Sequence, residues 1–401
     1  MLGKNILREI RGTWASDQLD MARGLAAVAV LLLHLRDLFF VDYQDLKNPS
    51  VGVSAFYVIG NFGHQAVVLF FVLSGYFISA TVLRSVTRGD WSWRGYFIQR
   101  IARLGVVLIP ALLLTALLDH SGMALFGLGH NYEGDGTVYI HDPGIVERLS
   151  VSTLAGNVFF LQTIVTPTFG SNSPLWSLSY ELWFYVFFPI AVLCIRPGRR
   201  WPTFVALPLV AVLVAARHGL AFYFAIWLLG YLAGSLPKLS VVATDRRAKA
   251  CAWSALAATA TILALIWFHR LESVILSDLA LGVAFAVFVY AVLQVGQQTS
   301  NGRHVRAGRV LAGFSYTLYA IHLPIIFFLR AWLIPNGRWL PTGTHLAYGT
   351  LLLLGILAAA YAVSRGTEAK TGAVRDLLAR VSGHTRLRRA PATERTPTDA
   401  R

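Results

Sequence analysis

Residues 19–35, LDMARGLAAVAVLLLHL, form an apolar run that contains two basic residues, Arg23 and His34, eleven positions apart. In a helix that enters a membrane near Arg23, a rise of about 1.5 Å per residue places His34 roughly 16 Å deeper. Both side chains lie on nearly the same face, because eleven residues make almost three turns. An imidazole at that depth suits general-base catalysis, since it ordinarily titrates near neutral pH. The alternative is a snorkelling arginine and a histidine that hydrogen-bonds to a neighbouring helix.

A lone carboxylate, Glu181, lies in the aromatic stretch SPLWSLSYELWFYVFFP, residues 173–189. Ionisable groups inside a bilayer cost several kcal/mol and by default mark functional sites. We expect Glu181 to find a cationic partner such as His34 or to be neutral.

A pair of arginines, Arg100 and Arg103, opens the apolar stretch QRIARLGVVLIP. Three positions apart, they share one helix face. Two guanidinium groups suit a phosphate-rich ligand, although such a pair is also common at the inner rim of a membrane helix.

Two more apolar stretches carry polar groups at similar depth. FFVLSGYFIS contains Ser74 followed by Gly75, which predicts either a functional hydroxyl or close helix packing through small residues. GFSYTLYAIHLPII contains His322, with Tyr319 one turn earlier on the same face. If these helices converge with those of His34 and Glu181, the polar groups form a chamber inside the membrane.

The composition requires a membrane setting for these groups. Of the 401 residues, 56% are hydrophobic and 14% are charged, whereas soluble domains carry about 25% charged residues. The net charge of +15 comes from short basic clusters between apolar runs, a pattern that favours the positive-inside rule over nucleic-acid binding. The two cysteines, Cys194 and Cys251, have no spacing typical of a disulfide framework, a zinc site or a thiol nucleophile.

The sequence therefore predicts an all-α polytopic transmembrane helix bundle. About ten segments have the roughly 20 mostly apolar residues that a span needs, at 20–40, 63–84, 97–118, 174–195, 202–217, 219–236, 250–268, 274–294, 309–333 and 344–364. With both termini cytoplasmic, the basic clusters fall on the inside, while the acidic loop 119–172 falls outside. The histidines of that loop lack metal-site spacing, so we expect no metal and a solvated loop that helps to admit a substrate.

We expect residues 1–364 to form one transmembrane domain and residues 365–401 a basic, disordered cytoplasmic tail near the anionic leaflet. The first nineteen residues contain no apolar core and predict no cleaved signal peptide. The sequence gives no indication of the oligomeric state.

The motifs LDMARGLAAVAVLLLH, FFVLSGYFIS, Arg-x-x-Arg, LWSLSYELWFYVFFP and SYTLYAIHLPI occur in the order seen in the bacterial acyltransferase-3 family of integral-membrane O-acyltransferases, which the chain resembles over most of its length. Met21 stands where a glycine is common in the family, and Leu182 where some members have a second acid.

The resemblance implies transfer of an acyl group, most often acetyl, from cytoplasmic acyl-CoA to a hydroxyl of a glycan, a macrolide-type metabolite or another envelope or secreted acceptor. It places the protein in the bacterial cytoplasmic membrane.

With that chemistry, His34 is expected to be the general base or, as a second option, a transient acyl carrier. Arg23 would steady the site or bind phosphates, and Glu181 would orient His34 or the acceptor.

The remaining residues have secondary roles in this scheme. Arg100 and Arg103 would hold the phosphates of coenzyme A, while Ser74, Tyr319 and His322 would line the chamber or stabilise the oxyanion.

Two other functions compete. A proton-coupled transporter would use the same intramembrane His, Glu and Arg residues, but the chain shows no related halves of the kind common in transporters. A non-enzymatic membrane scaffold would leave Glu181 without a role.

Overall fold

The computed structural model describes residues 10–128, 132, 144–195, 208, 218–239, 244–268, 273–296, 302–334 and 337–383. The regular elements in these residues are all helices, which confirms the all-α prediction. The α-helices are α1 (Trp14–Phe39), α2 (Val51–Ile59), α3 (Gly63–Arg88), α4 (Trp93–Phe126), α6 (Ile145–Arg148), α7 (Val151–Val158), α8 (Trp176–Cys194), α10 (His218–Ser235), α11 (Asp245–Trp267), α12 (Val274–Gln294), α13 (Arg303–Leu333), α14 (Gly343–Gly366) and α15 (Thr371–Val381). Short 3-10 turns are η1 (Tyr43–Asp45), η2 (Ser173–Leu175) and η3 (Glu368–Lys370).

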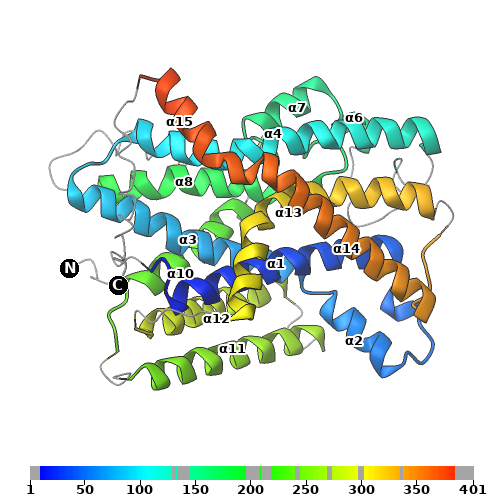
Figure 1. The fold of residues 1–401 in the computed structure, drawn as a ribbon, viewed down its shortest axis with the longest axis horizontal. Helices are drawn as coiled ribbons and strands as arrows, with labels where there is room; N and C mark the ends of the chain where they lie inside the picture. Colours follow the sequence, from blue (N-terminus) through cyan, green and yellow to red (C-terminus); the bar gives the residue numbers. More distant parts are fainter. Residues whose placement is uncertain are drawn as a thin grey trace, which may run out of the picture.

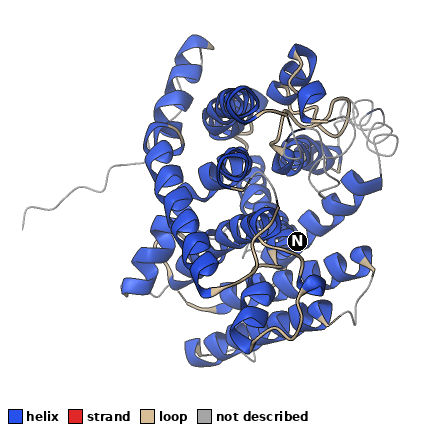
Figure 2. Cartoon of the chain, turned by 90° about the vertical axis from the view of Figure 1, so that its right-hand side faces the viewer, coloured by secondary structure: helices blue, strands red, loops and turns tan. Residues whose placement is uncertain are grey.

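The long helices form a bundle that suits a bilayer. Within the described residues, 8 helices are long and apolar enough to cross a membrane, and Gly219–Ser235 is a shorter apolar helix. Most long helices run in a similar direction (Figure 1), and several are seen end-on when the bundle is turned (Figure 2). The predicted span at 202–217 lies outside the described residues except for position 208. The number of spans and the side on which the termini lie stay predictions.

The ends of α3 give the bundle its two ends. The helix finishes at Arg88, next to the start of α4 at Trp93, and Gly89 closes it in the left-handed conformation with φ of 78°. A glycine adopts this conformation without strain. We call this the basic end, and the end where α3 begins at Gly63 the far end. Ser92 then starts α4 by accepting a hydrogen bond from the backbone N–H of Gly95.

Glycines bring α3 into backbone contact with α10. A Cβ at Gly75 would lie 1.9 Å from the carbonyl oxygen of Trp227, and one at Gly230 would lie 1.9 Å from that of Val72. Neither position accepts any side chain, so the helices approach as closely as small residues allow. Gly75 therefore serves close helix packing, one of the two roles that the sequence predicts for the Ser74–Gly75 pair.

The helices α1 and α13 also pack closely at glycines, but here each glycine faces a larger side chain of the other helix. A Cβ at Gly24 would lie 2.6 Å from Cβ of Leu311, and one at Gly308 would lie 2.9 Å from Cε of Met21. Met21, which stands where the family commonly has a glycine, thus fills the space that Gly308 leaves.

Two prolines inside helices, Pro189 and Pro324, free carbonyl groups that accept hydrogen bonds from side chains elsewhere in the chain. Proline has no N–H, so the carbonyl four residues earlier loses its helical donor. Pro189 frees the carbonyl of Tyr185, which accepts a hydrogen bond from the hydroxyl of Tyr96 at 3.0 Å. Backbone polar groups need such partners inside a membrane.

The second proline, Pro324, frees the carbonyl of Ala320, and Nδ2 of Asn172 donates to that oxygen at 2.9 Å. The helix that contains Pro324, α13, changes direction between its two halves (Figure 1). The loop before α8 is thereby fastened to the middle of α13.

The predicted disordered tail contains a helix. Residues 371–381 form α15, which packs against α4. Val374, Leu377, Leu378 and Val381 recur at spacings of about three and four residues, the period of an amphipathic helix. The prediction was wrong for this segment because the charged residues between these positions mask the apolar stripe. Residues 384–401 lie outside the described residues.

The contact between α3 and α10 predicts a strong effect of a single methyl group. Gly75→Ala should lower the free energy of unfolding in detergent by about 2 kcal/mol or more, as overpacked sites do. Gly105→Ala in α4 is the matched control, since nothing lies within 4 Å of a Cβ built there. Thermal unfolding followed by tryptophan fluorescence measures both variants. Equal melting temperatures for the two variants would contradict the close contact.

Candidate active site

A cavity of about 750 Å³ lies between α1, α3, α4, α8 and α13. Ligand sites in proteins commonly have volumes of this order. Along α3, its lining residues run from Val67 to Arg88, a length of about 32 Å at the rise of a helix. The cavity therefore reaches from the basic end deep into the bundle.

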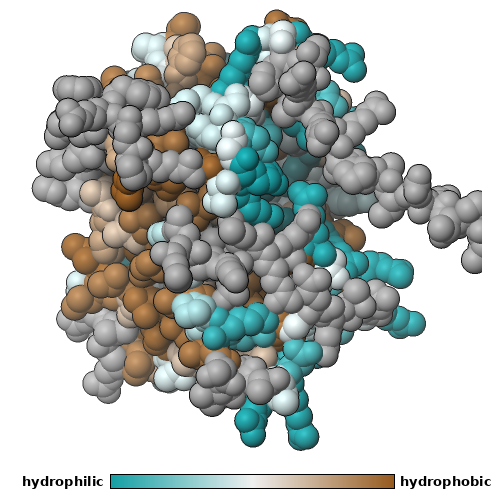
Figure 3. All heavy atoms as spheres, turned by 90° about the vertical axis from the view of Figure 1, so that its left-hand side faces the viewer, coloured by the Kyte–Doolittle hydropathy of each residue, from teal (hydrophilic) through white to brown (hydrophobic). Residues whose placement is uncertain are grey.

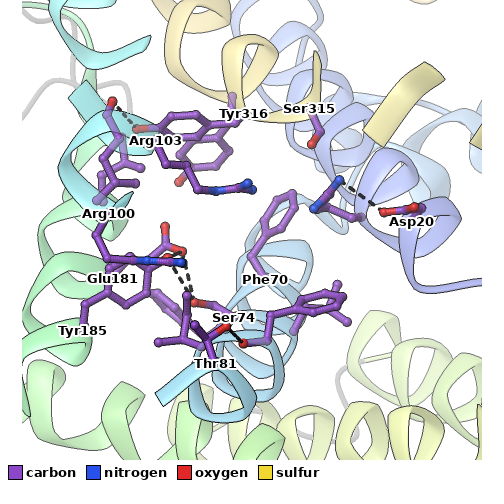
Figure 4. Close-up of a pocket in the computed structure, with 18 of the residues that line it drawn as sticks. Asp20, Phe70, Ser74, Thr81, Arg100, Arg103, Glu181, Tyr185, Ser315 and Tyr316 are labelled. Atoms are coloured by element: carbon purple, nitrogen blue, oxygen red, sulfur yellow. Dashed lines mark hydrogen bonds and ion pairs between the residues drawn. The ribbon is translucent and has the colours of Figure 1, made fainter. Parts of the chain in front are cut away.

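Arginines from four segments surround the cavity at the basic end. The lining contains Arg100 and Arg103 of α4 and Arg23 of α1, as the sequence predicted, with Arg103 and Arg100 directed toward the middle of the cavity (Figure 4). It also contains Arg11, Arg84 and Arg88. Among the described lining residues, the acids beside these six arginines are Asp20 and Glu181. Figure 3 looks onto this end of the bundle, where hydrophilic side chains gather beside an apolar flank. The cavity is therefore electropositive.

Two of these arginines, Arg23 and Arg100, have a buried Nε–H that is available to a ligand. The Nε atoms of Arg23 and Arg100 are buried and have no hydrogen-bond partner among the described residues. Arg23 donates instead through its terminal nitrogen to the carbonyl of Ala312, and pairs with Asp20, each at 3.2 Å. The guanidinium of Arg100 lies over the ring of Tyr185, 5.9 Å from its centroid. Buried donors without a partner are costly, and an anionic ligand would satisfy them.

The carboxylate of Glu181 is held by two hydroxyl groups. Ser74 donates to Oε1 at 3.1 Å, and Tyr185, one turn further along α8, donates to the same oxygen. The indole N–H of Trp227 donates to Oγ of Ser74 at 3.2 Å and so orients its hydroxyl. Both bonds to Glu181 reach Oε1, so Oε2 can accept a hydrogen bond from a ligand. The hydroxyl of Ser74 thus takes part in the hydrogen bonds of the site, whereas Gly75 allows the close helix packing.

The two intramembrane histidines form a pair. Nε2 of His322 lies 2.8 Å from Nδ1 of His34. Nδ1 of His322 lies 3.0 Å from the carbonyl of Leu318 and 2.8 Å from that of Tyr319. Carbonyl oxygens only accept, so this Nδ1 carries the proton and the Nε2 of neutral His322 is an acceptor.

The tautomer of His34 follows from this pairing. Its Nδ1 must donate to His322, and its Nε2 therefore carries the lone pair. The arrangement resembles the base and orienting partner of a catalytic triad, with an imidazole in place of the carboxylate.

The histidine pair lies next to the cavity, behind its aromatic lining. Tyr319 and Phe70 both line the cavity, and their rings pack 5.9 Å apart. The ring of His322 lies 6.0 Å from that of Tyr319. His34 keeps 7% of its surface accessible, whereas His322 is completely buried. Of the two imidazoles, His322 packs against the cavity lining, and His34 keeps the accessible surface.

Two further hydroxyl groups, those of Tyr319 and Ser177, line this part of the cavity. The hydroxyl of Tyr319 lies 2.7 Å from that of Ser177 and donates to the carbonyl of Pro174 at 3.0 Å. Ser177 and Tyr319 both line the cavity. These hydroxyls are hydrogen-bond donors close to the histidine pair.

Most of the predicted residues form two hydrogen-bonded pairs and a set of arginines around one cavity. Ser74 joins Glu181, His322 joins His34, and the arginines form the basic end. The expected pairing of Glu181 with His34 is replaced by bonds within these separate groups. Within the described residues, no group of three metal-ligating side chains lies close together; His130 and His141 of the loop lie outside them.

Several residues of the site were missed from the sequence. Tyr185 and Ser177 lie four positions after and before Glu181, so helical spacing alone could have indicated them. Arg84 and Arg88 were treated only as indicators of orientation. Trp227 carried no signal, because its contact with Ser74 depends on how α3 and α10 pack.

Comparisons with known proteins show which family the chain matches. Residues 16–365 match the family model described as "Acyltransferase domain". A stretch of 181 residues is 32% identical to "Acyltransferase MdmB" of Streptomyces mycarofaciens, covering 44% of this chain and 40% of that protein. The match thus spans well under half of the relative. No solved structure matches the chain.

The bonds around Ser74 predict a measurable loss when its hydroxyl is removed. Ser74→Ala leaves the buried N–H of Trp227 without a partner and removes one of the two donors to the carboxylate of Glu181, which should cost about 1–3 kcal/mol in the free energy of unfolding. Ser79→Ala is the control, since that buried hydroxyl donates only to the carbonyl of Tyr76 in its own helix. Thermal unfolding in detergent compares them. A loss for Ser74→Ala no larger than for Ser79→Ala would contradict the assigned bonds.

Proposed function

Because the chain belongs to the acyltransferase-3 family, we propose that this membrane protein transfers an acyl group, most commonly acetyl, from acyl-CoA to a hydroxyl of an envelope or secreted acceptor such as a glycan or macrolide-type metabolite. The observation that carries the proposal is the cavity itself. It has six arginines at one end and is lined by Glu181 and Tyr319, and the ring of Tyr319 lies 6.0 Å from that of His322 in the histidine pair. We place the protein in the bacterial cytoplasmic membrane.

The basic end is where coenzyme A would bind. Its pyrophosphate and its separate ribose phosphate carry several negative charges, and guanidinium groups bind phosphates with two parallel hydrogen bonds. Arg100 and Arg103 project from one face of α4 toward the cavity (Figure 4). With the phosphates held there, the flexible arm of the donor extends along α3 toward Ser74 and Phe70.

His34 would act as the general base. A hydroxyl attacks a thioester slowly until a base removes its proton. Nε2 of His34 takes that proton as the acceptor oxygen bonds to the thioester carbonyl carbon. When the bond from carbon to sulfur breaks, the same proton passes to the leaving thiolate of coenzyme A. His322 keeps Nδ1 of His34 as the donor throughout.

The remaining groups would bind the acceptor and the developing charge. Glu181 can accept a hydrogen bond from the acceptor through Oε2, because Oε1 already holds Ser74 and Tyr185. The hydroxyl of Ser177 can turn from Tyr319 and donate its proton to the oxyanion that forms on the thioester carbonyl, while Tyr319 keeps its bond to the carbonyl of Pro174.

Removal of the base tests the assignment directly. His34→Ala should lower the rate of acetyl transfer by about 10²–10⁴ and leave the affinity for acetyl-CoA unchanged, since His34 is absent from the described lining of the donor cavity. Purified protein in detergent with radiolabelled acetyl-CoA provides the measurement. His345→Ala, at a half-buried histidine stacked on Trp339 and absent from the described lining of the cavity, is the control and should keep the wild-type rate. Transfer that survives in His34→Ala would remove this residue from its role, and solute uptake into vesicles without transfer would favour a transporter.

The arginines predict a separate effect on the donor. Arg100→Ala or Arg103→Ala should each weaken acetyl-CoA binding about tenfold, equivalent to about 1.4 kcal/mol, as expected for a lost charged hydrogen bond. Arg306→Ala is the matched control, because Arg306 is exposed at the start of α13 and does not line the cavity. Equilibrium dialysis with labelled acetyl-CoA measures binding without turnover. Equal weakening by all three variants would mean that only the general positive charge of this end matters.

A further inference from the structure

A second polar cluster lies at the far end of the bundle, away from the arginines. Nε2 of His64 lies 2.9 and 3.1 Å from the two carboxylate oxygens of Asp278. The hydroxyl of Tyr223 donates to the same carboxylate at 2.8 Å. These residues come from α3, α12 and α10, and the mechanism above uses none of them. We call them the far-end cluster.

The cluster exposes its imidazole while burying its carboxylate. The side chain of Asp278 is 1% accessible, whereas that of His64 is 39% accessible. Asp278 fixes the proton of neutral His64 on Nε2, so Nδ1 carries the lone pair. No described residue donates to that Nδ1. A contact that served only to hold three helices together would not need to leave a hydrogen-bond acceptor open to a ligand.

The far-end cluster lies directly beyond the cavity. His64 precedes Val67 by three positions and Phe71 by seven on the same helix, and both of these residues line the cavity. Side chains at these spacings lie on one side of a helix. The exposed imidazole thus lies about one turn past the last lining residue of α3.

Aromatic rings separate the cluster from the cavity. The ring of Phe71 packs 5.3 Å from that of Tyr223 and 6.0 Å from that of Trp176, and these two rings lie 5.6 Å apart. Phe71 faces the cavity, and Tyr223 bonds to Asp278. The ring of Phe71 thus contacts both the cavity and the cluster. Rings with hydrogen-bonding groups beside them also suit the C–H faces and hydroxyls of a sugar.

We propose that the far-end cluster binds the acceptor, a sugar-bearing molecule that enters from the side opposite coenzyme A, with Nδ1 of His64 accepting a hydrogen bond from one of its hydroxyls. Donor and acceptor then approach the histidine pair from opposite ends of one passage. His64 is a binding residue in this scheme, and His34 remains the base. The inference rests on the proposed acyl transfer.

The first test is the side from which His64 can be reached. His64→Cys is built on a Cys194→Ala, Cys251→Ala background and treated in right-side-out vesicles with a membrane-impermeant maleimide. We expect modification without permeabilisation, whereas Arg88→Cys, at the basic end, should react only after permeabilisation. Modification of both cysteines from the same side would overturn the proposal.

The second test separates binding of the acceptor from use of the donor. Purified protein receives labelled acetyl-CoA and methyl glucoside, and the ratio of acetylated glucoside to free acetate is measured. His64→Gln can still donate to Asp278 and so preserves the tie between helices, but it lacks the ring nitrogen. We expect this ratio to fall at least tenfold, with the KM for acetyl-CoA within twofold of wild type and His345→Gln unchanged.

The outcomes distinguish the two proposals. A wild-type protein that neither binds nor consumes acetyl-CoA would defeat the proposed function, whatever the labelling shows. Consumption of acetyl-CoA with an unchanged product ratio in His64→Gln would defeat only the acceptor site. Wild-type protein that releases acetate but forms no glucoside ester would rule out a sugar as the acceptor.

Discussion

A carboxylate inside a bundle of apolar helices needs hydrogen-bond donors, and the site is built around that requirement at Glu181, which is half-buried in the cavity wall. Ser74 and Tyr185 supply the hydroxyls, and Trp227 orients Ser74. The indole of Trp227 reaches Ser74 only because α3 and α10 touch through their backbones at Gly75 and Gly230. The packing of two helices and the polarity of the cavity are thus one feature, since a wider spacing would leave the carboxylate with fewer donors at a cost of several kcal/mol.

The prolines extend this dependence to the other helices. A helix interrupted by proline presents a carbonyl that must find a donor elsewhere when no water is present. Tyr96 of α4 satisfies the one on α8 at Tyr185, whose hydroxyl holds Glu181. Asn172 satisfies the one on α13 at Ala320, two residues before His322. Each bend is therefore fastened close to a functional group, and rotation of α8 or α13 would break a backbone bond as well as move the group.

The sequence allowed much of the fold and the main site residues to be predicted, because both follow from local rules. Apolar length locates the helices, and a polar group inside a span is unusual enough to stand out, as at His34, Glu181 and His322. The partners of those groups depend on packing between helices far apart in the chain. His34 bonds to His322 rather than facing Glu181, and Trp227 looked like one apolar aromatic among many. The helix at Thr371–Val381 was missed for a different reason, since its apolar stripe is short and interrupted by charge.

Arg100 connects the two chemically distinct parts of the cavity. Its guanidinium lies between the rings of Tyr96 and Tyr185, 5.6 and 5.9 Å from their centroids. The hydroxyl of Tyr96 donates to the carbonyl freed by Pro189, and the hydroxyl of Tyr185 donates to the carboxylate of Glu181. A cation over an aromatic face contributes about 0.5–2 kcal/mol, more when water is excluded, so an anion that draws Arg100 away must change how firmly Tyr185 is held. Arg100 therefore links the basic end, through its contact with the ring of Tyr185, to the carboxylate deeper in the bundle.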